Sequence, residues 1–193
     1  MNFSKLYFAL SIMMFIVAVS TAQSATIHVP ADLPTIQAGI DAAIAGDTVL
    51  VADGTYTGPG NRDIDFGGKG IVLKSENGTG VTIIDCEGSE SNQHRGFYFH
   101  SGEDSTAVVD GFTIQGGYAD YGGGINCDSS SSPKRINNPI SGNSAGGNGG
   151  GIYCIASSPT ISNNTISGNT TPCSEDASVG NGGGIYCVSN SNP

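Results

Sequence analysis

The sequence is poor in charged residues, especially basic ones, and it contains no tryptophan. Charged residues make up 12% of the 193 residues, which excludes a highly charged disordered chain. Seven Lys and Arg residues stand against 17 Asp and Glu residues, which gives a net charge of −10. We expect no nucleic-acid partner, because phosphate binding needs a basic surface. Sustained heptads are also absent, which excludes a coiled coil.

Leucine is scarce after residue 22, where three Leu residues stand against 17 Ile residues. Leu favours helices, whereas the branched Ile side chain fits a pleated surface. Between Gly111 and Pro193, the types Gly, Asn and Ser supply 42 of 83 residues. The chain is therefore predicted to consist of short strands separated by turns.

The apolar residues of this second part recur with a fixed period. Ile114, Ile140 and Ile166 are spaced by 26 residues at each step, and a second column of GGGI(N/Y)C occurs at 122–127, 149–154 and 182–187. Repeats of this length are typical of solenoids, in which each coil buries its apolar face against its neighbours. Equivalent strands are then parallel and adjacent, and recurrent Asn residues are expected to stack at the corners (137/138, 163/164 and 143/169).

The N-terminal residues 1–22 form an apolar segment after Lys5 that ends in small residues, with an expected cleavage after Ala22. This pattern predicts a secretory signal peptide. We expect the mature protein to be secreted or exposed at the cell surface, with no membrane span.

A short helix is predicted over 34–46, where Ile36, Ile40 and Ile44 share one face. Thr35 is the expected N-cap and Gly46 the expected stop. Such a helix can cover the open edge of the first coil.

These motifs resemble the secreted right-handed parallel β-helix proteins of bacteria, which have the pectin-lyase-like fold. The GGGI repeats are also similar to those of polymorphic outer-membrane-protein passenger domains, although the FxxN element of those repeats is absent. The resemblance implies an all-β, right-handed parallel β-helix solenoid with a short N-terminal capping helix. We expect this domain to cover residues 26–193 and to be truncated at its C-terminal end. The fold hosts enzymes and binding proteins alike, so activity depends on the site.

Asp85 and Asp110 are the first candidate binding residues. The segments TIID (82–85) and AVVD (107–110) align at a spacing of 25, which predicts carboxylates stacked about one strand apart. Such a pair could bind Ca²⁺, act as the acid and base of a glycosidase, or only hydrogen-bond its own turns. No cofactor other than this Ca²⁺ is expected.

The basic candidates for catalysis are few. Arg95 lies between His94 and the strand at 97–99, which His100 follows, while Lys74 and Arg135 lie elsewhere. Nothing in the sequence fixes these side chains against a carboxylate, so solvated turn residues are the default interpretation. Arg135 also occupies the column of Val109 and Ile161, which makes one coil irregular.

Cys127, Cys154 and Cys187 occupy one position of three coils, and we expect a ladder of buried thiols that behave as small apolar groups. Zinc is not expected, because the spacing of zinc ligands is missing. Cys173 falls in a predicted insertion loop (170–181). Tyr153 and Tyr186 should face outward, where they could pack on a sugar ring or simply cover the sheet.

We therefore expect a non-enzymatic module that is adhesin-like or binds a polysaccharide or cell-surface glycan. The alternative is a polysaccharide-active lyase, hydrolase or epimerase, which would need carboxylates and a base on one face.

Overall fold

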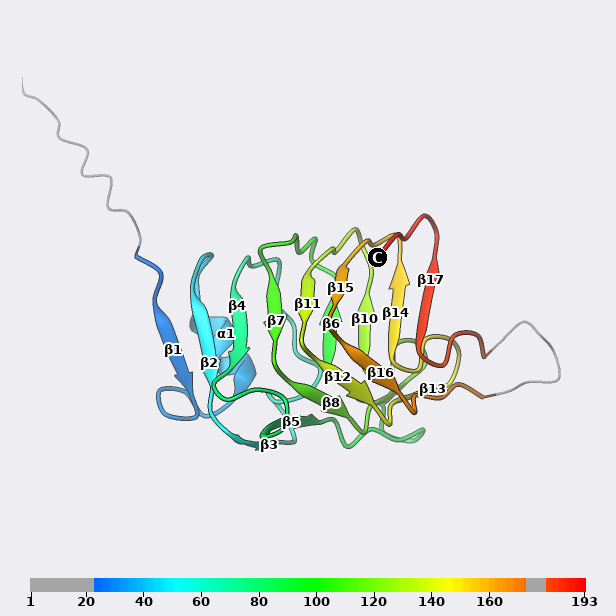
Figure 1. Cartoon of the computed structure of the whole chain (residues 1–193), viewed down its shortest axis with the longest axis horizontal. Helices are drawn as coiled ribbons and strands as arrows, with labels where there is room; N and C mark the ends of the chain where they lie inside the picture. Colours follow the sequence, from blue (N-terminus) through cyan, green and yellow to red (C-terminus); the bar gives the residue numbers. More distant parts are fainter. Residues whose placement is uncertain (1–22, 173–179) are drawn as a thin grey trace, which may run out of the picture.

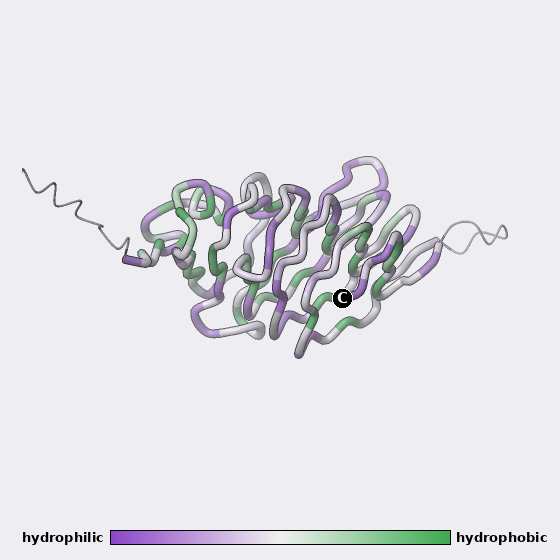
Figure 2. The backbone as a smooth tube through the Cα atoms, turned by 90° about the horizontal axis from the view of Figure 1, so that it is seen from above, coloured by the Kyte–Doolittle hydropathy of each residue, from purple (hydrophilic) through white to green (hydrophobic). Residues whose placement is uncertain are grey.

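The structure is a computed structural model that describes residues 23–172 and 180–193. The predicted signal peptide, Cys173 and most of the predicted insertion loop lie outside these residues. Within the described chain, the strands form parallel ladders that wind into a solenoid, and successive coils follow one another along its long axis (Figures 1 and 2). The predicted all-β parallel solenoid is confirmed.

The coils build three main sheets. The long sheet contains β1 (Thr26–Val29), β2 (Thr48–Val51), β4 (Val72–Ser75), β7 (Val108–Asp110), β11 (Lys134–Ile136) and β15 (Thr160–Ser162). The five-stranded sheet contains β3 (Gly54–Tyr56), β5 (Thr82–Asp85), β8 (Thr113–Gln115), β12 (Pro139–Ser141) and β16 (Thr165–Ser167). The four-stranded sheet contains β6 (Phe97–Phe99), β10 (Ile125–Cys127), β14 (Ile152–Ile155) and β17 (Ile185–Val188). A small pair joins β9 (Tyr118–Ala119) to β13 (Ser144–Ala145).

The predicted isoleucine column is confirmed. Ile114 pairs in register with Ile140, which pairs with Ile166 on the next coil. Ile114 and Ile140 are fully buried, and Ile166 packs against the same core. Each coil thus buries its apolar side chains against the coils on either side, as the period of 26 requires.

Asparagine side chains hold the corners of the regular coils. Asn138 and Asn143 are fully buried, and each accepts a hydrogen bond from a backbone N–H of the preceding coil. The side chain of Asn143 donates in turn to the carbonyl of Ile114 at 3.1 Å. Asn137 and Asn163 both adopt φ of 56°, the left-handed conformation that Asn tolerates. The predicted corner ladder is therefore confirmed.

The triple glycines before β10 show why the GGGI motif recurs. Gly122 has φ of 65°, which most side chains avoid. A Cβ on Gly123 would lie 2.0 Å from the carbonyl oxygen of Ser144, which no side chain can occupy. The motif lets the chain turn tightly and pass close to the next coil.

The helix α1 (Ile36–Ala42) closes the interior at the N-terminal end, packing on β1 and β2 (Figure 1). Thr35 caps it as predicted, accepting from the N–H of Ala38 at 3.2 Å. The expected stop at Gly46 is wrong, because the helix ends at Ala42 and Gly46 lies in the following turn. Ile44 is accordingly 59% exposed rather than part of the buried face.

Candidate functional site

The outward face of the four-stranded sheet carries a row of aromatic and amide side chains. The parallel register places Tyr98, Asn126, Tyr153 and Tyr186 opposite one another on β6, β10, β14 and β17. The alternating residues Phe97, Phe99, Ile125 and Cys127 are buried on the inward face. The pleat therefore separates a core side from a row that faces solvent.

Tyr98 and Asn126 of this row, together with three residues that flank β6 and β10, form what we call the polar patch: Arg95, Tyr98, His100, Asn126 and Asp128. The guanidinium carbon of Arg95 lies 5.0 Å from the centroid of the Tyr98 ring. The His100 ring stacks on Tyr98 with centroids 4.1 Å apart and planes at 17°. The hydroxyl of Tyr98 donates to Asp128 at 2.8 Å. Tyr98 thus contacts Arg95, His100 and Asp128 and brings these three side chains together.

Each of the other four patch residues presents a shielded polar atom without a hydrogen-bond partner in the described chain: Arg95 Nη1, His100 Nδ1, Asn126 Oδ1 and Asp128 Oδ1. Asn126 is 8% exposed, whereas the other three residues are half-buried. Buried polar groups are normally satisfied, so a cluster of such atoms on one face marks groups that a water or a ligand can bind. Rotation of the half-buried side chains can present their atoms to such a partner.

Two carboxylates from the preceding coil border the patch. Asp63 accepts from the backbone N–H of Arg95 at 2.9 Å and contacts His94 Nδ1 at 2.6 Å. Asp65 Oδ1 lies 3.9 Å from His100 Nδ1. Sequence reasoning missed both residues, because the short NRDIDF segment (61–66) pairs with the four-stranded sheet only through the bridge between Ile64 and Phe97. DIDF (63–66) has apolar residues at its second and fourth positions, as GFYF (96–99) does. This shared alternation is the signal that could have placed Asp63 and Asp65 beside the sheet.

Burial and neighbouring carboxylates shift the pKa of Arg95 in opposite directions. Desolvation lowers the pKa of Arg95, while the charges of Asp63, Asp120 and Asp128 favour its protonated form. Desolvation, followed by the hydrogen bond to Asp128, raises the pKa of Tyr98. Tyr98 therefore stays a neutral donor at physiological pH.

Tyr121, Tyr153 and Tyr186 continue this face as what we call the tyrosine column. The rings of Tyr153 and Tyr186 are nearly parallel, with centroids 5.8 Å apart, and Tyr121 lies 5.1 Å from Tyr153. The predicted outward stack is confirmed. Because the rings cover one another's faces, a ligand beside Tyr153 meets ring edges and hydroxyl groups.

The predicted stacking of Asp85 on Asp110 is wrong. Asp85 ends β5 in the five-stranded sheet and pairs with Gln115, whereas Asp110 ends β7 in the long sheet and pairs with Lys74. Coil length varies in this part of the chain, so the spacing of 25 aligns strands of different sheets. Asp85 accepts from the N–H of Glu87 in its own turn and from the Gln115 amide. The glycosidase and Ca²⁺ hypotheses built on this pair lose their geometric basis.

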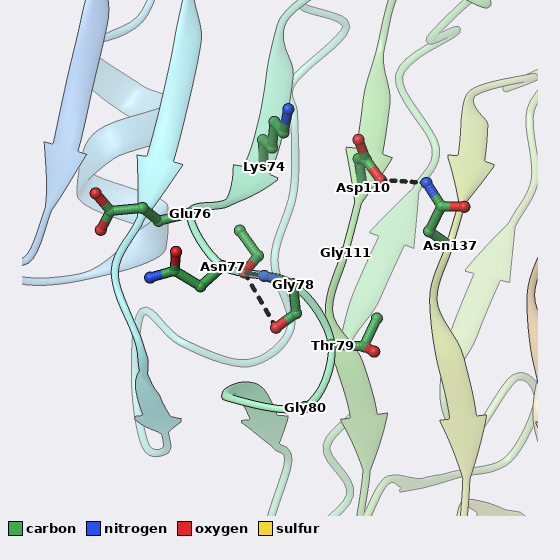
Figure 3. A pocket seen from close by; sticks show the side chains of 10 residues that line it. Lys74, Glu76, Asn77, Gly78, Thr79, Gly80, Asp110, Gly111 and Asn137 are labelled. Atoms are coloured by element: carbon green, nitrogen blue, oxygen red, sulfur yellow. Dashed lines mark hydrogen bonds between the residues drawn. The ribbon is translucent and has the colours of Figure 1, made fainter.

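Asp110 instead lines a corner hollow of about 500 Å³ (Figure 3). The segment between β4 and β5 forms one wall, and Gly111 and Asn137 lie opposite. The Asn137 amide donates to Asp110 at 2.8 Å. Lys74 adjoins Asp110 in the register and is exposed, as expected for a solvated residue.

Inside the solenoid, the predicted thiol ladder is present. Cys127, Cys154 and Cys187 pair in register, and all three are free thiols. Arg135 is not the solvated residue we expected, because it is fully buried, donates to the sulfur of Cys127 and lies 5.4 Å from the Phe99 ring. It does occupy the column of Val109 and Ile161, as predicted.

This contact changes the chemistry of one thiol. Desolvation raises the pKa of Cys127, but the hydrogen bond from Cys154 and the charge and hydrogen bond of Arg135 outweigh it, lowering the pKa to about 7. The pKa of Cys154 is raised, first by its hydrogen bond to Cys127 and then by desolvation. Arg135 therefore favours the thiolate form of Cys127, while Cys154 is held as a neutral thiol beside it.

The sequence model of the family described as "Right handed beta helix region" matches residues 49–193. The chain belongs to the right-handed β-helix family. No curated protein and no solved structure gives a significant match to this β-helix. In the described part of the β-helix, no three His, Cys, Asp or Glu residues gather as metal ligands would. Nor do these residues include a helix with the length and apolar character needed to cross a bilayer.

Proposed function

We propose that this β-helix is a non-catalytic, secreted or cell-surface module that binds a glycan along the outward face of its four-stranded sheet. The observation that carries the proposal is the polar patch, where planar polar groups with unsatisfied atoms surround an aromatic ring. Glycan sites in general need hydrogen-bonding groups for hydroxyls together with an apolar ring surface. The predicted signal peptide supports an extracellular location.

The tyrosine column extends the proposed site over β14 and β17. Its rings contribute edges and hydroxyl groups to a polymer that lies across the coils, while the patch supplies the main hydrogen bonds. Tyr153 and Tyr186 are thus secondary contacts in this proposal. Asp85 and Asp110 have no role in it, since both lie outside the four-stranded sheet.

Affinity electrophoresis through gels that contain neutral or acidic polysaccharides tests this function. Wild-type protein should be retarded by at least one of them. Tyr98→Ala should weaken binding by about tenfold, because it removes the ring that holds Arg95, His100 and Asp128 together. Tyr186→Ala should weaken it by about threefold, because aromatic contacts contribute about 0.5–1.5 kcal/mol. Asp110→Asn, in the corner hollow, is the matched control and should bind like wild type. Absence of retardation in every gel would overturn the proposal.

An enzymatic alternative has one specific observation in its favour. The 2.6 Å contact between Asp63 and His94 is the orientation that a general base requires. If this pair acts on a polysaccharide, incubation of wild-type protein with polymer would release reducing or unsaturated ends, and His94→Ala would abolish the release. Release of such ends would replace the binding proposal with an enzyme.

A further inference from the structure

The charges around the polar patch are predominantly negative. Arg95 is its one arginine, and the carboxylates of Asp63, Asp120 and Asp128 all act on the Arg95 guanidinium. Asp65 adds a fourth negative charge within reach of Tyr98. An anionic ligand would approach a net negative face on a chain whose overall charge is −10.

The single charge of Arg95 offsets only part of this field for an incoming anion. Its guanidinium lies over the Tyr98 ring, and its backbone N–H already binds Asp63. The two imidazoles lie beside carboxylates, His94 with Asp63 at 2.6 Å and His100 with Asp65 at 3.9 Å. The basic side chains at and beside the patch are therefore each placed against an aspartate or an aromatic ring.

The unpartnered atoms lead to the same conclusion independently. Asn126 Oδ1 and Asp128 Oδ1 can only accept, so they need hydrogen-bond donors from a ligand. Arg95 Nη1 can only donate, so it needs an acceptor. A hydroxyl group both donates and accepts, so a sugar hydroxyl can partner either kind of atom. A carboxylate or sulfate group has no proton to donate, so an acidic sugar can serve the two oxygens only through its remaining hydroxyls.

We propose that the polar patch selects uncharged sugars through adjacent hydroxyl groups and rejects acidic ones. This inference rests on the proposed glycan-binding function and names its ligand class. It makes the outward face of the sheet a site for neutral hexose or pentose polymers, with Asn126 and Asp128 accepting from hydroxyls and Arg95 donating to them.

Isothermal titration calorimetry with hexasaccharides tests this selection directly. Neutral probes are the hexamers of glucose, mannose, galactose and xylose, and the acidic probe is hexagalacturonate. We expect at least one neutral hexamer to bind at least about tenfold more tightly than the acidic hexamer at 20 mM salt. Tighter binding of the acidic hexamer would overturn the inference but leave glycan binding intact. If no hexamer binds, the proposed function fails together with the inference.

A charge-neutralised variant separates repulsion from poor fit. Asp65→Asn combined with Asp120→Asn removes two negative charges beside the patch and keeps side chains that can accept the bonds from Gly67 N–H and the Gln93 amide. Affinity for hexagalacturonate should rise about threefold to tenfold, while affinity for the neutral hexamer changes by less than about threefold.

The matched control is Asp53→Asn combined with Glu76→Gln, which removes the same charge near the corner hollow. Glu76 lies between β4 and β5, and Asp53 lies between β2 and β3 and accepts from Asn77 at 3.0 Å. This control should leave both affinities unchanged. Thermal unfolding followed by circular dichroism confirms that both variants fold. An unchanged hexagalacturonate affinity in the patch variant, or an equal rise in the control, would contradict the inference.

Discussion

The two halves of the four-stranded sheet share one backbone and differ in what they present to solvent. β6 and β10 carry Tyr98, His100, Asn126 and the following Asp128, whereas β14 and β17 carry Tyr153, Ile155, Tyr186 and Val188 in the equivalent positions. The register is continuous across all four strands. The repeated backbone therefore decides where side chains point, and departures from the repeat decide what chemistry they bring.

The inward face shows the same contrast. Beneath the first half lies Arg135, buried against Cys127 and Phe99, while Ile161 occupies its column one coil later. A charged group in a solenoid core is stable only if an anion accompanies it. The predictions below perturb the irregular half and compare it with the regular one.

The largest effect should come from removing the anion beside Arg135. Cys127→Ala leaves a buried guanidinium without its partner, and we expect a loss of about 3–5 kcal/mol in the free energy of unfolding. Cys154→Ala, one coil along, removes only a neutral thiol and should cost about 1–2 kcal/mol. Urea denaturation of both variants measures the difference, and equal losses would show that Cys127 is no thiolate.

The corner ladder, which belongs to the regular coils, should give the next effect. Asn143→Ala orphans the N–H of Gly117 and the carbonyl of Ile114 in the core and should cost about 2–3 kcal/mol. Asn169 is only half-buried, so water can replace its bonds and Asn169→Ala should cost about 1 kcal/mol. The same denaturation assay compares the two. A smaller loss at Asn143 would contradict the ladder.

Stability should also depend on pH through Cys127. The folded state lowers the pKa from 9.0 to about 7, so the unfolded state binds more protons between these values. The contribution of the thiolate is present above about pH 9 and is lost as pH falls through about 7, an expected change of about 2 kcal/mol. Unfolding free energies at pH 6, 7, 8 and 9 measure it, and Cys127→Ser should flatten the rise.

The smallest effect, and the opposite sign, is expected for Arg135→Ile. This change restores the apolar column of Val109 and Ile161 and returns Cys127 to a neutral thiol. Replacing a buried ion pair with a packed apolar side chain is often stabilising, here by about 1 kcal/mol. A thermal melt that shifts downward would mean that the cation supports the coil in a way that its contacts do not show.

The regular half of the molecule could be predicted from the sequence because its period is strict. The column of Ile114, the corner asparagines and the outward Tyr153 and Tyr186 all follow from spacing and alternation. The earlier coils could not, because coil length varies there, and the spacing of 25 between Asp85 and Asp110 joins strands of different sheets. The chemistry of the patch was missed for the same reason.

Two side-chain contacts also could not be predicted from the spacing of residues in the sequence. Arg135 was identified as an exception in its column, but its burial depends on the thiolate of Cys127, which lies eight residues away on another sheet. The contact of Asp63 with His94 joins two segments through a single bridge, and no periodicity signals it.

Amide hydrogen exchange with and without a bound neutral hexasaccharide tests the central claim most directly. If the irregular half of the four-stranded sheet holds the glycan, protection should increase over 95–100 and 126–128, more weakly over 153–155, and not at the corner hollow around 76–80. Protection confined to the corner hollow, or spread evenly over all coils, would contradict the account.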